Sequence, residues 1–236
     1  MNFKLIYILP NLFTAASIFL GIISVIASIN QNFDKALIYI ILSLICDGLD
    51  GRVARATNST SKFGVEFDSL ADLIAFGVAP AMLFYMSIGY EYGRFGSLIA
   101  GLFVVFGAIR LARFNVTTGT YEPSVFIGLP IPTAAVVSAL WVSAYLYYDF
   151  LRDFSLMIVC IQILLAFLMV SNIRYPSFKK IDLKRANVLK VLILLVILFS
   201  MLYLYFLESA LIVASLYVLY GIIRSFFTLA RKFKKD

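Results

Sequence analysis

The stretch Asp47-Gly-Leu-Asp50-Gly51-Arg-Val-Ala54-Arg55, followed after eight residues by Gly64-Val-Glu-Phe-Asp68-Ser-Leu-Ala-Asp72, places four aspartates within 26 residues of a very apolar chain. Each pair, spaced by three or four residues, lies on one face of a predicted helix. Charged groups near a bilayer are costly and rarely face lipid, which favours a functional site where the two pairs face one another. Four hard oxygen ligands are typical of a site for a divalent metal such as Mg²⁺.

Composition places this site in a membrane protein. The 236 residues are 62% hydrophobic and 14% charged, with a mean hydropathy of +0.97, so we expect one integral membrane domain over residues 1–236 and no separate soluble domain. The absence of histidine excludes a Ser–His–Asp triad, a histidine metal site and a histidine general base. Cys46 and Cys160 lie in apolar segments without a CxxC motif and are predicted to be buried apolar residues.

Apolar runs predict an all-α, polytopic fold with about eight transmembrane helices, at residues 12–29, 35–54, 67–89, 94–114, 133–148, 154–173, 191–207 and 209–227. Residues 1–9 are expected to form a short interfacial helix, and Pro80 to kink the third span. Three glycines of the fourth span, Gly96, Gly101 and Gly107, would allow close helix approach. Residues 1–175 would form a six-helix catalytic core, and 176–236 a basic loop and a C-terminal helical hairpin.

The basic residues predict the orientation of these spans. Eight spans put both termini on one side of the membrane, and only Lys35, Arg94 and Arg152 of the 20 Lys and Arg residues fall on the other side. This asymmetry assigns both termini and the acidic site to the cytoplasmic face of the cell membrane. The basic loop and tail are expected to contact anionic membrane lipids, and no nucleic-acid partner is expected because no aromatic–basic module is present.

Glycines and basic residues complete the acidic stretch. Gly51 and Gly64 allow a ligand to approach the backbone, and Arg55 offers a fixed cation, with Lys62 in the connecting loop. This combination suits a phosphate or pyrophosphate bridged by metal, and four carboxylates suffice for two ions in an in-line displacement. A divalent-cation transporter is the alternative, but it predicts carboxylates near the membrane midplane on broken helices.

The pattern Asp-x2-Asp-Gly-x2-Ala-Arg-x8-Gly-x3-Asp-x3-Asp resembles the signature of the CDP-alcohol phosphatidyltransferase family, and this chain has every fixed residue of it. The resemblance implies transfer of a phosphatidyl group from a CDP-linked lipid to an alcohol, with release of CMP. It implies Mg²⁺ or Mn²⁺, held as two ions by Asp47, Asp50, Asp68 and Asp72, with Asp72 also the general base. Implied contacts to the CDP-lipid are Pro10, Asn11, Thr14, Gly51, Arg55, Ser61 and Gly64. A homodimer is implied as well.

Further motifs resemble the phosphatidylserine synthases of this family, which implies L-serine as the acceptor. They are Asp47-Gly48-Leu49-Asp50, Phe67-Asp68-Ser-Leu-Ala-Asp72, Arg110-Leu-Ala-Arg113-Phe-Asn115 and Gly128-Leu-Pro-Ile-Pro132. Arg110 and Arg113 are candidates for the serine carboxylate, and Asn115 and Glu66 for its amine or hydroxyl. The alternative for the two arginines is that they extend to lipid headgroups and set the topology. Separately, the alternative acceptors are inositol phosphate, glycerol phosphate or another polar alcohol. An apolar groove hardly distinguishes ester-linked diacyl chains from ether-linked isoprenoid chains, so the sequence leaves both kinds of lipid open.

Overall fold

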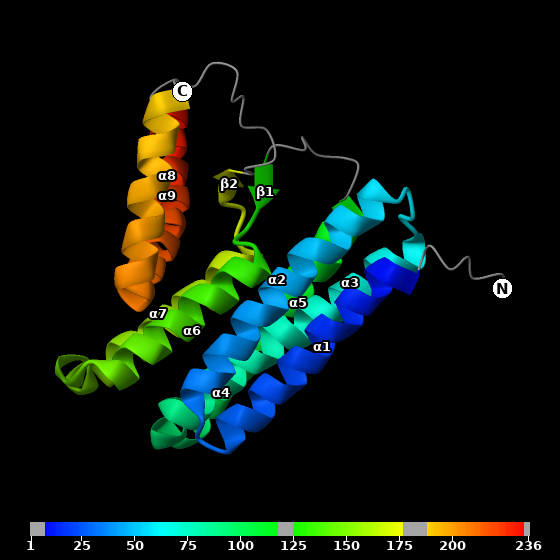
Figure 1. Ribbon diagram of the computed structural model, residues 1–236. Helices are drawn as coiled ribbons and strands as arrows, with labels where there is room; N and C mark the ends of the chain where they lie inside the picture. The colour runs from blue at the N-terminus through cyan, green and yellow to red at the C-terminus, as the bar shows by residue number, and fades with distance from the viewer. Residues whose placement is uncertain (1–7, 118–124, 177–187, 234–236) are drawn as a thin grey trace.

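The computed structural model describes residues 8–117, 125–176 and 188–233, which form long helices and one pair of short strands (Figure 1). The elements in chain order are α1 (Ile8–Ile29), α2 (Phe33–Ala56), α3 (Lys62–Asp72), a π-helix (Leu73–Val78), α4 (Ala79–Ser87), a 3-10 helix (Gly89–Tyr92), α5 (Gly93–Thr117), β1 (Val125–Ile127), α6 (Ile131–Tyr147), a 3-10 helix (Asp149–Phe154), α7 (Ser155–Val170), β2 (Arg174–Pro176), α8 (Val188–Leu204) and α9 (Phe206–Phe233). The fold is all-α and polytopic, as the apolar runs predict.

Five helical stretches in the described part of the chain are long and apolar enough to cross a membrane: Ile8–Ile29, Lys62–Ser87, Gly89–Thr117, Asp149–Val170 and Phe206–Phe227. The other three expected spans coincide with α2, α6 and α8, of which α6 and α8 have 17 residues each. That length is about the shortest with which a helix crosses the hydrocarbon core. The interfacial helix expected at residues 1–9 lies mostly outside the described residues.

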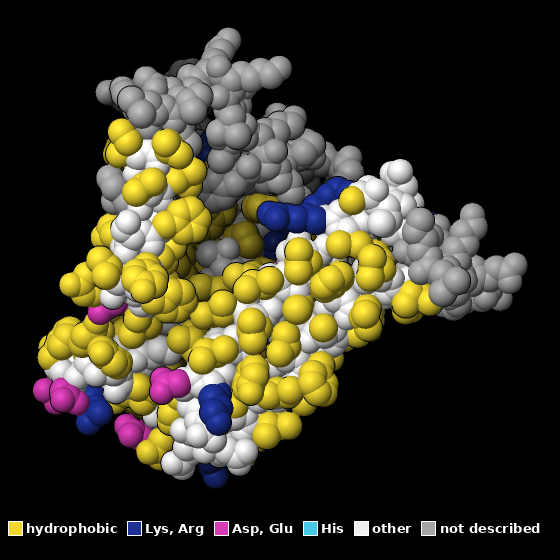
Figure 2. All heavy atoms as spheres, in the orientation of Figure 1, with side chains coloured by type: hydrophobic (Ala, Val, Ile, Leu, Met, Phe, Trp, Pro, Cys, Tyr) yellow, Lys and Arg dark blue, Asp and Glu magenta, His cyan; other side chains and the backbone are white. Residues whose placement is uncertain are grey.

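The outer surface of the helices is apolar. Figure 2 shows hydrophobic side chains along the helices and charged side chains gathered toward their ends. Phe19, Leu98 and Phe167, on three different helices, are 65%, 56% and 54% exposed. An apolar surface of this extent is favourable against lipid and unfavourable in water. The chain is therefore an integral membrane protein. Cys46 is half-buried and Cys160 is exposed, so the expectation that both are buried is wrong, because their helices turn these positions outward.

Serine hydroxyls fix α1 against α2. Ser43 Oγ donates to the carbonyl of Ser17 at 2.9 Å, and Ser24 Oγ donates to the carbonyl of Ala36 at 2.9 Å. All three serines are buried, and small side chains of this kind let two helix backbones approach closely in a membrane. This pairing sets the register of α1 on α2 and so determines which residue of α1 meets the acidic end of α2.

The third predicted span is one helical stretch with a change of helix type in its middle. Asp68 and Asp72 lie on α3, the π-helix covers Leu73–Val78, and Pro80 lies in the first turn of α4. Proline has no N–H to continue the regular hydrogen-bond ladder, so an irregularity before it has a local cause. The irregularity expected near Pro80 takes the form of a π-helix, a type often found at functional sites.

A short antiparallel ladder, which the sequence did not predict, connects the segments before α6 and after α7. Phe126 of β1 lies opposite Tyr175 of β2. Tyr175 is fully buried, and this burial raises the pKa of its hydroxyl to about 12, so the hydroxyl stays protonated at neutral pH. The ladder thereby places one large aromatic ring in the core.

The C-terminal hairpin of α8 and α9 packs through α9 on α6. Trp141 Nε1 donates to Ser215 Oγ at 3.2 Å, and the Tyr148 hydroxyl donates to the Glu208 carboxylate. The hydrogen bond to Glu208 raises the pKa of Tyr148 to about 12, so Tyr148 remains a donor at neutral pH. Two contacts, one from the middle of α6 and one just after its C-terminal end, therefore hold α9 in place.

Candidate active site

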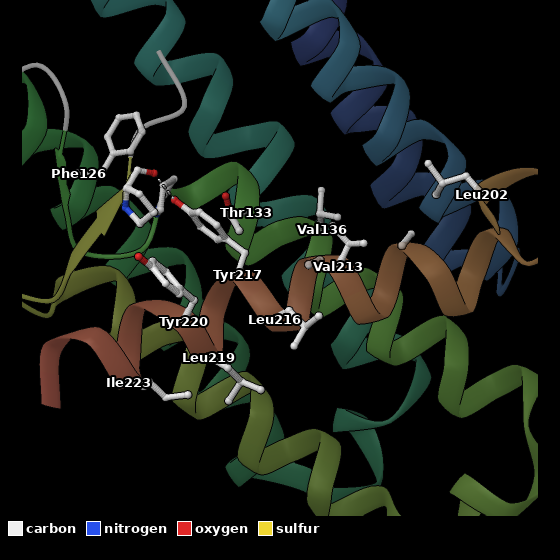
Figure 3. A pocket seen from close by; sticks show the side chains of 14 residues that line it. Phe126, Thr133, Val136, Leu202, Val213, Leu216, Tyr217, Leu219, Tyr220 and Ile223 are labelled. Carbon is white, nitrogen blue, oxygen red and sulfur yellow. Dashed lines mark hydrogen bonds between the residues drawn. The ribbon is translucent and has the colours of Figure 1, made fainter. Parts of the chain in front are cut away.

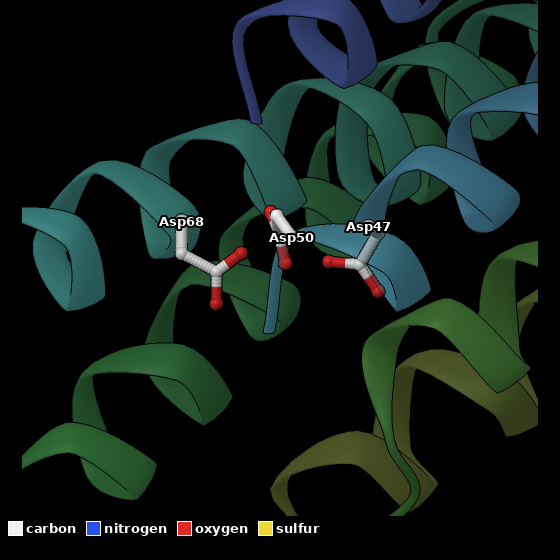
Figure 4. A group of neighbouring side chains, drawn as sticks. All are labelled: Asp47, Asp50 and Asp68. Carbon is white, nitrogen blue, oxygen red and sulfur yellow. The ribbon is translucent and has the colours of Figure 1, made fainter. Parts of the chain in front are cut away.

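Four aspartates from two neighbouring helices meet at one end of the bundle. Asp47 and Asp50 come from α2 and Asp68 from α3, and Figure 4 shows their carboxylates pointing toward one another. One oxygen from each lies within 4.8 Å of the others. Asp72 lies beside Asp47, and Asp68 lies beside Asp50. The structure therefore brings together all four aspartates that the spacing singled out.

This cluster fits a divalent cation. The Oδ1 atoms of Asp68 and Asp72 are buried and have no hydrogen-bond partner among the described residues. In that part of the chain, no Lys or Arg forms an ion pair with any of the four carboxylates. Buried carboxylates this close repel one another unless protons or cations lie between them, and hard oxygen ligands suit Mg²⁺ or Mn²⁺. The donor set thus matches the expected metal.

Helix α1 also reaches this cluster. Thr14 Oγ1 donates to Asp50 Oδ2 at 2.8 Å, and both side chains are buried. The register of α1 on α2 makes this contact possible, because the serine bonds farther along the two helices align them. A fixed donor on one oxygen orients the carboxylate and leaves its other oxygen to face its neighbours.

A cavity of about 200 Å³ adjoins the aspartates. Every residue predicted to contact the CDP-lipid lines it: Pro10, Asn11, Thr14, Gly51, Arg55, Ser61 and Gly64. Asp50 and Asp68 line it too, so the cavity opens directly onto the acidic cluster. Four further lining residues, Ala54, Ser59, Thr60 and Val65, were not predicted as contacts. Ser59 and Thr60 belong to the polar segment Thr57-Asn-Ser-Thr-Ser-Lys62 that connects the two acidic helices, and its polarity is visible in the sequence.

Local geometry explains the glycines and the serine of this cavity. Ser61 is the N-cap of α3, because its Oγ accepts from the backbone N–H of Gly64 at 3.0 Å. A Cβ on Gly64 would lie 3.2 Å from that Oγ. A Cβ on Gly51 would lie 3.3 Å from a guanidinium nitrogen of Arg55, so this side chain folds back over the glycine. Because neither glycine has a side chain, both keep the cavity open, and the Arg55 guanidinium lies at its wall.

A second polar group joins α3 to α5 near Asp68. Asn115 Nδ2 donates to Ser69 Oγ at 2.9 Å and to Glu66 Oε2 at 3.3 Å. Asn115 Oδ1 is buried and has no partner within the described part of the chain. The structure thus brings together the two predicted acceptor contacts, Glu66 and Asn115. Ser69 was missed, because its place beside Asn115 follows from helix packing that the sequence does not show.

The two candidate arginines differ in their surroundings. Arg110 is 7% exposed, its guanidinium lies 5.3 Å from the ring centre of Phe114, and its charge acts on Asp72. Arg113 instead donates to the backbone carbonyls of Ile127, Met169, Val170 and Ser171 at 2.9 to 3.1 Å. Arg113 therefore ties β1 to the end of α7, a structural task that the sequence analysis did not predict.

Comparison with known proteins adds evidence that is independent of this geometry. The sequence pattern of a family described as CDP-alcohol phosphatidyltransferase matches residues 7–168. A CDP-diacylglycerol–serine O-phosphatidyltransferase of Helicobacter pylori is 50% identical over 227 residues, which cover 96% of this chain and 94% of the relative. An archaetidylserine synthase of Methanothermobacter thermautotrophicus is 38% identical over 170 residues, 71% of this chain and 69% of the relative. A CDP-diacylglycerol–serine O-phosphatidyltransferase of Bacillus subtilis is 34% identical over 172 residues, 73% and 92% respectively.

Proposed function

Because this chain belongs to the CDP-alcohol phosphatidyltransferase family, we propose that it transfers the phosphatidyl group of CDP-diacylglycerol, or of an ether-linked CDP-lipid, to the hydroxyl of L-serine. The products are phosphatidylserine, or its ether-linked counterpart, and CMP. The proposal depends on a combination of sequence identity and site geometry. The chain is 50% identical to a serine phosphatidyltransferase over 96% of its length, and its four aspartates meet beside a cavity lined by every predicted CDP contact.

In this proposal the four aspartates bind two divalent ions, Mg²⁺ or Mn²⁺, which when bound supply positive charge to the pyrophosphate and to the departing CMP. Arg55 and the backbone at Gly51 and Gly64 bind the nucleotide phosphates within the cavity. Ser61 supports this cavity as the N-cap of α3, and Thr14 holds Asp50 in orientation. The acyl chains remain among the apolar faces of the helices.

Asp72 is the proposed general base. Its Oδ1 is buried and has no partner among the described residues, so it can accept the proton of the serine hydroxyl. The serine oxygen then attacks the lipid-side phosphorus in line, the bond from this phosphorus to the CMP oxygen breaks, and CMP leaves with the electron pair. An aspartate is a weak base for an alcohol, so alignment of the hydroxyl is as important as proton removal.

The acceptor amino acid is proposed to lie between α3 and α5. Arg110 offers a buried cation for its carboxylate, and Asn115 Oδ1 and Glu66 offer acceptors for its ammonium group. Arg113 supports this pocket indirectly, because its donors are committed to backbone carbonyls. Glycerol phosphate and inositol phosphate have no ammonium group, so they would leave these two acceptors unmatched.

We also propose that this site and both termini face the cytoplasm, and that the chain forms a homodimer. The orientation is supported by the basic residues, because Lys35, Arg94 and Arg152 lie at the end of the bundle away from the aspartates. The dimer is supported by family resemblance and by the apolar faces that the described helices leave exposed.

One assay tests the function. Purified protein is incubated with CDP-diacylglycerol, Mg²⁺ or Mn²⁺, and a panel of L-serine, glycerol phosphate and inositol phosphate, and CMP release is measured. We expect release only with serine, its loss in excess chelator, and its return when the metal is restored. CMP release with a phosphorylated alcohol instead of serine would mean that the chain is an enzyme of this family with another acceptor. Metal flux across vesicles without CMP release would favour a transporter.

A further inference from the structure

The polar group between α3 and α5 contains a serine to which the proposed acceptor site gives no role. Ser69 lies on α3, directly after Asp68, and its half-buried side chain contacts Asn115 of α5. The family pattern fixes the aspartates at positions 68 and 72 and leaves position 69 free. A residue at a free position is not required for the chemistry that the family shares, so it is available to distinguish one acceptor from another.

The hydroxyl of Ser69 meets Asn115 only as an acceptor. Ser69 Oγ donates its one proton to the backbone carbonyl of Val65, four residues earlier on α3, at 3.1 Å. A hydroxyl has a single proton to donate, and its lone pairs are all that remain for a second partner. The atom of Asn115 that lies 2.9 Å from Ser69 Oγ is therefore the donor Nδ2.

The second neighbour of the Asn115 amide requires the same orientation. Nδ2 also donates to Glu66 Oε2 at 3.3 Å, and a carboxylate only accepts. An amide rotated by half a turn would point Oδ1 at two oxygen acceptors and replace both hydrogen bonds by repulsion. The Glu66 side chain is exposed, where water and salt weaken its attraction, so the shorter bond to half-buried Ser69 contributes more to the orientation.

This orientation leaves Asn115 Oδ1 as a buried acceptor without a partner among the described residues. Asp72 Oδ1 is also buried and lacks a partner in that part of the chain. Ser69 lies three residues before Asp72 and therefore on the same side of α3, so the amide held at Ser69 is about one helical turn from the proposed base. Two buried oxygens without donors match a ligand that has a hydroxyl proton and an ammonium group on neighbouring carbons.

The apolar cavity beside α9 offers no comparable place for such a ligand. Its volume is about 1170 Å³, and Figure 3 shows the side chains of α9 that line it. The described residues that line this cavity include no charged side chain, and the side-chain polar groups among them are the hydroxyls of Thr133, Tyr217 and Tyr220. An amino acid has two charged groups, which are costly to bury without charged or well-placed polar partners.

We propose that Ser69 is a positioning residue that holds the Asn115 amide with Oδ1 toward the ammonium group of the acceptor. This inference rests on the proposed function, because it takes an amino acid as the acceptor. Ser69 acts through Asn115 and does not itself contact the substrate. Without the Ser69 hydroxyl the amide rotates more freely and also presents Nδ2, a donor, to the ammonium group. The loss therefore weakens the binding of serine more than the binding of CDP-lipid or the chemical step.

The first test compares Ser69→Ala with Ser97→Ala in the full-length protein in detergent–lipid micelles with CDP-dioleoylglycerol and Mg²⁺. Ser97 is a matched control on α5, because its Oγ also donates to the carbonyl four residues earlier, at 3.1 Å, and makes no other hydrogen bond within the described residues. We expect Ser69→Ala to raise the KM for serine by roughly 3- to 10-fold, the scale of one hydrogen bond. The kcat and the KM for CDP-lipid should stay within about twofold, and Ser97→Ala should behave like the unaltered protein.

Two further variants test whether the hydroxyl acts through the amide. Ser69→Thr keeps a hydroxyl that can bond the same carbonyl, so its serine KM should return to within about twofold of the unaltered value. Asn115→Ala should itself raise the serine KM. In the Asn115→Ala background, Ser69→Ala should produce no further rise, because the group that it orients is absent.

Results that would overturn the inference differ from failure of the proposed function. An unchanged serine KM in Ser69→Ala, equal rises in the KM of serine and CDP-lipid, or no recovery in Ser69→Thr would each remove the positioning role. Additive effects of Ser69→Ala and Asn115→Ala would show that the serine does not act through the asparagine. In all these cases the unaltered protein would still release CMP in a serine-dependent reaction, whereas absence of that release would overturn the proposed function itself.

Discussion

At the scale of single residues, Asp72 is set apart from the other three aspartates. Asp47, Asp50 and Asp68 bring their oxygens together within 4.8 Å, whereas Asp72 lies beside Asp47 and within the field of Arg110. A carboxylate between a metal-binding group and a buried cation is well placed to act on the acceptor. This position supports a role for Asp72 in proton transfer as well as in metal binding.

Asp72→Asn should reduce CMP release by about 10²- to 10⁴-fold, the usual contribution of a positioned base, because an amide cannot accept the hydroxyl proton. Affinity for CDP-lipid, measured by equilibrium binding of a radiolabelled lipid with Mg²⁺ present, should change only a few-fold. Asp149→Asn, on an exposed side chain in the 3-10 helix after α6, is the control and should keep full activity. Normal turnover of Asp72→Asn would rule out the base assignment.

Arg113→Lys should destabilise the protein by about 1.5–3 kcal/mol, because lysine cannot replace a planar fork that serves four carbonyls. The readout is the apparent melting temperature in detergent. Arg152→Lys, on an exposed arginine paired with Asp149, should leave the melting temperature unchanged. If Arg113→Lys kept the melting temperature but raised the serine KM, the structural role would be refuted and a direct contact of Arg113 with the acceptor would be supported.

The sequence was most informative about the residues whose spacing is itself the signal. Asp47 and Asp50 share a helix face and need no tertiary information, and the fixed pattern supplied their partners on α3. The contact of Asn115 with Ser69 and Glu66 depends on how α5 packs on α3, which no local pattern specifies. The carbonyl contacts of Arg113 were equally invisible, because their acceptors are backbone atoms of segments far away in the chain.

At the scale of elements, apolar length predicted most helices to within a few residues, because a membrane requires each span to satisfy its own backbone. The strands at Val125–Ile127 and Arg174–Pro176 were missed, because three residues show no reliable alternation and their pairing is long-range. The π-helix was expected only as a kink, because Pro80 signals a break without specifying its form.

The glycines of α5 are not equivalent. A Cβ on Gly96 would lie 1.8 Å from the carbonyl oxygen of Gly89, whereas Gly101 faces open space. Gly96→Ala should therefore lower stability by about 1–3 kcal/mol through overpacking, seen as a lower apparent melting temperature. Gly101→Ala should keep or slightly raise it, because alanine favours a helix more than glycine does. Equal melting temperatures for the two variants would contradict the close approach of α5 to the preceding turn.

At the scale of the whole molecule, polarity is arranged along the bundle axis. The acidic cluster and its cavity lie at one end, and the helix ends that contain Lys35, Arg94 and Arg152 lie at the other (Figure 1). The apolar faces between them account for the exposed hydrophobic side chains of the described helices. A substrate with a charged head and apolar chains can therefore meet the cluster from within the membrane plane.

The proposed orientation predicts which loops a membrane-impermeant maleimide can reach. In a background with Cys46 and Cys160 changed to alanine, Asp149→Cys should be labelled in intact spheroplasts. Asn58→Cys, exposed in the turn between α2 and α3, should be labelled only after permeabilisation. The reverse pattern would place the acidic site outside the cell and refute a cytoplasmic supply of CDP-lipid.

The π-helix between α3 and α4 has a consequence for how this protein tolerates changes in length. A π-turn is an α-helix with an extra residue, and one residue corresponds to about 100° of rotation about the helix axis. The extra residue thus rotates the face of α3 that presents Asp68 and Asp72 to α2 relative to the face of α4 that is buried in the core. Removing a single residue from Leu73–Val78 would remove this rotation and turn both carboxylates away from their partners. A one-residue deletion here would therefore be more damaging than most substitutions.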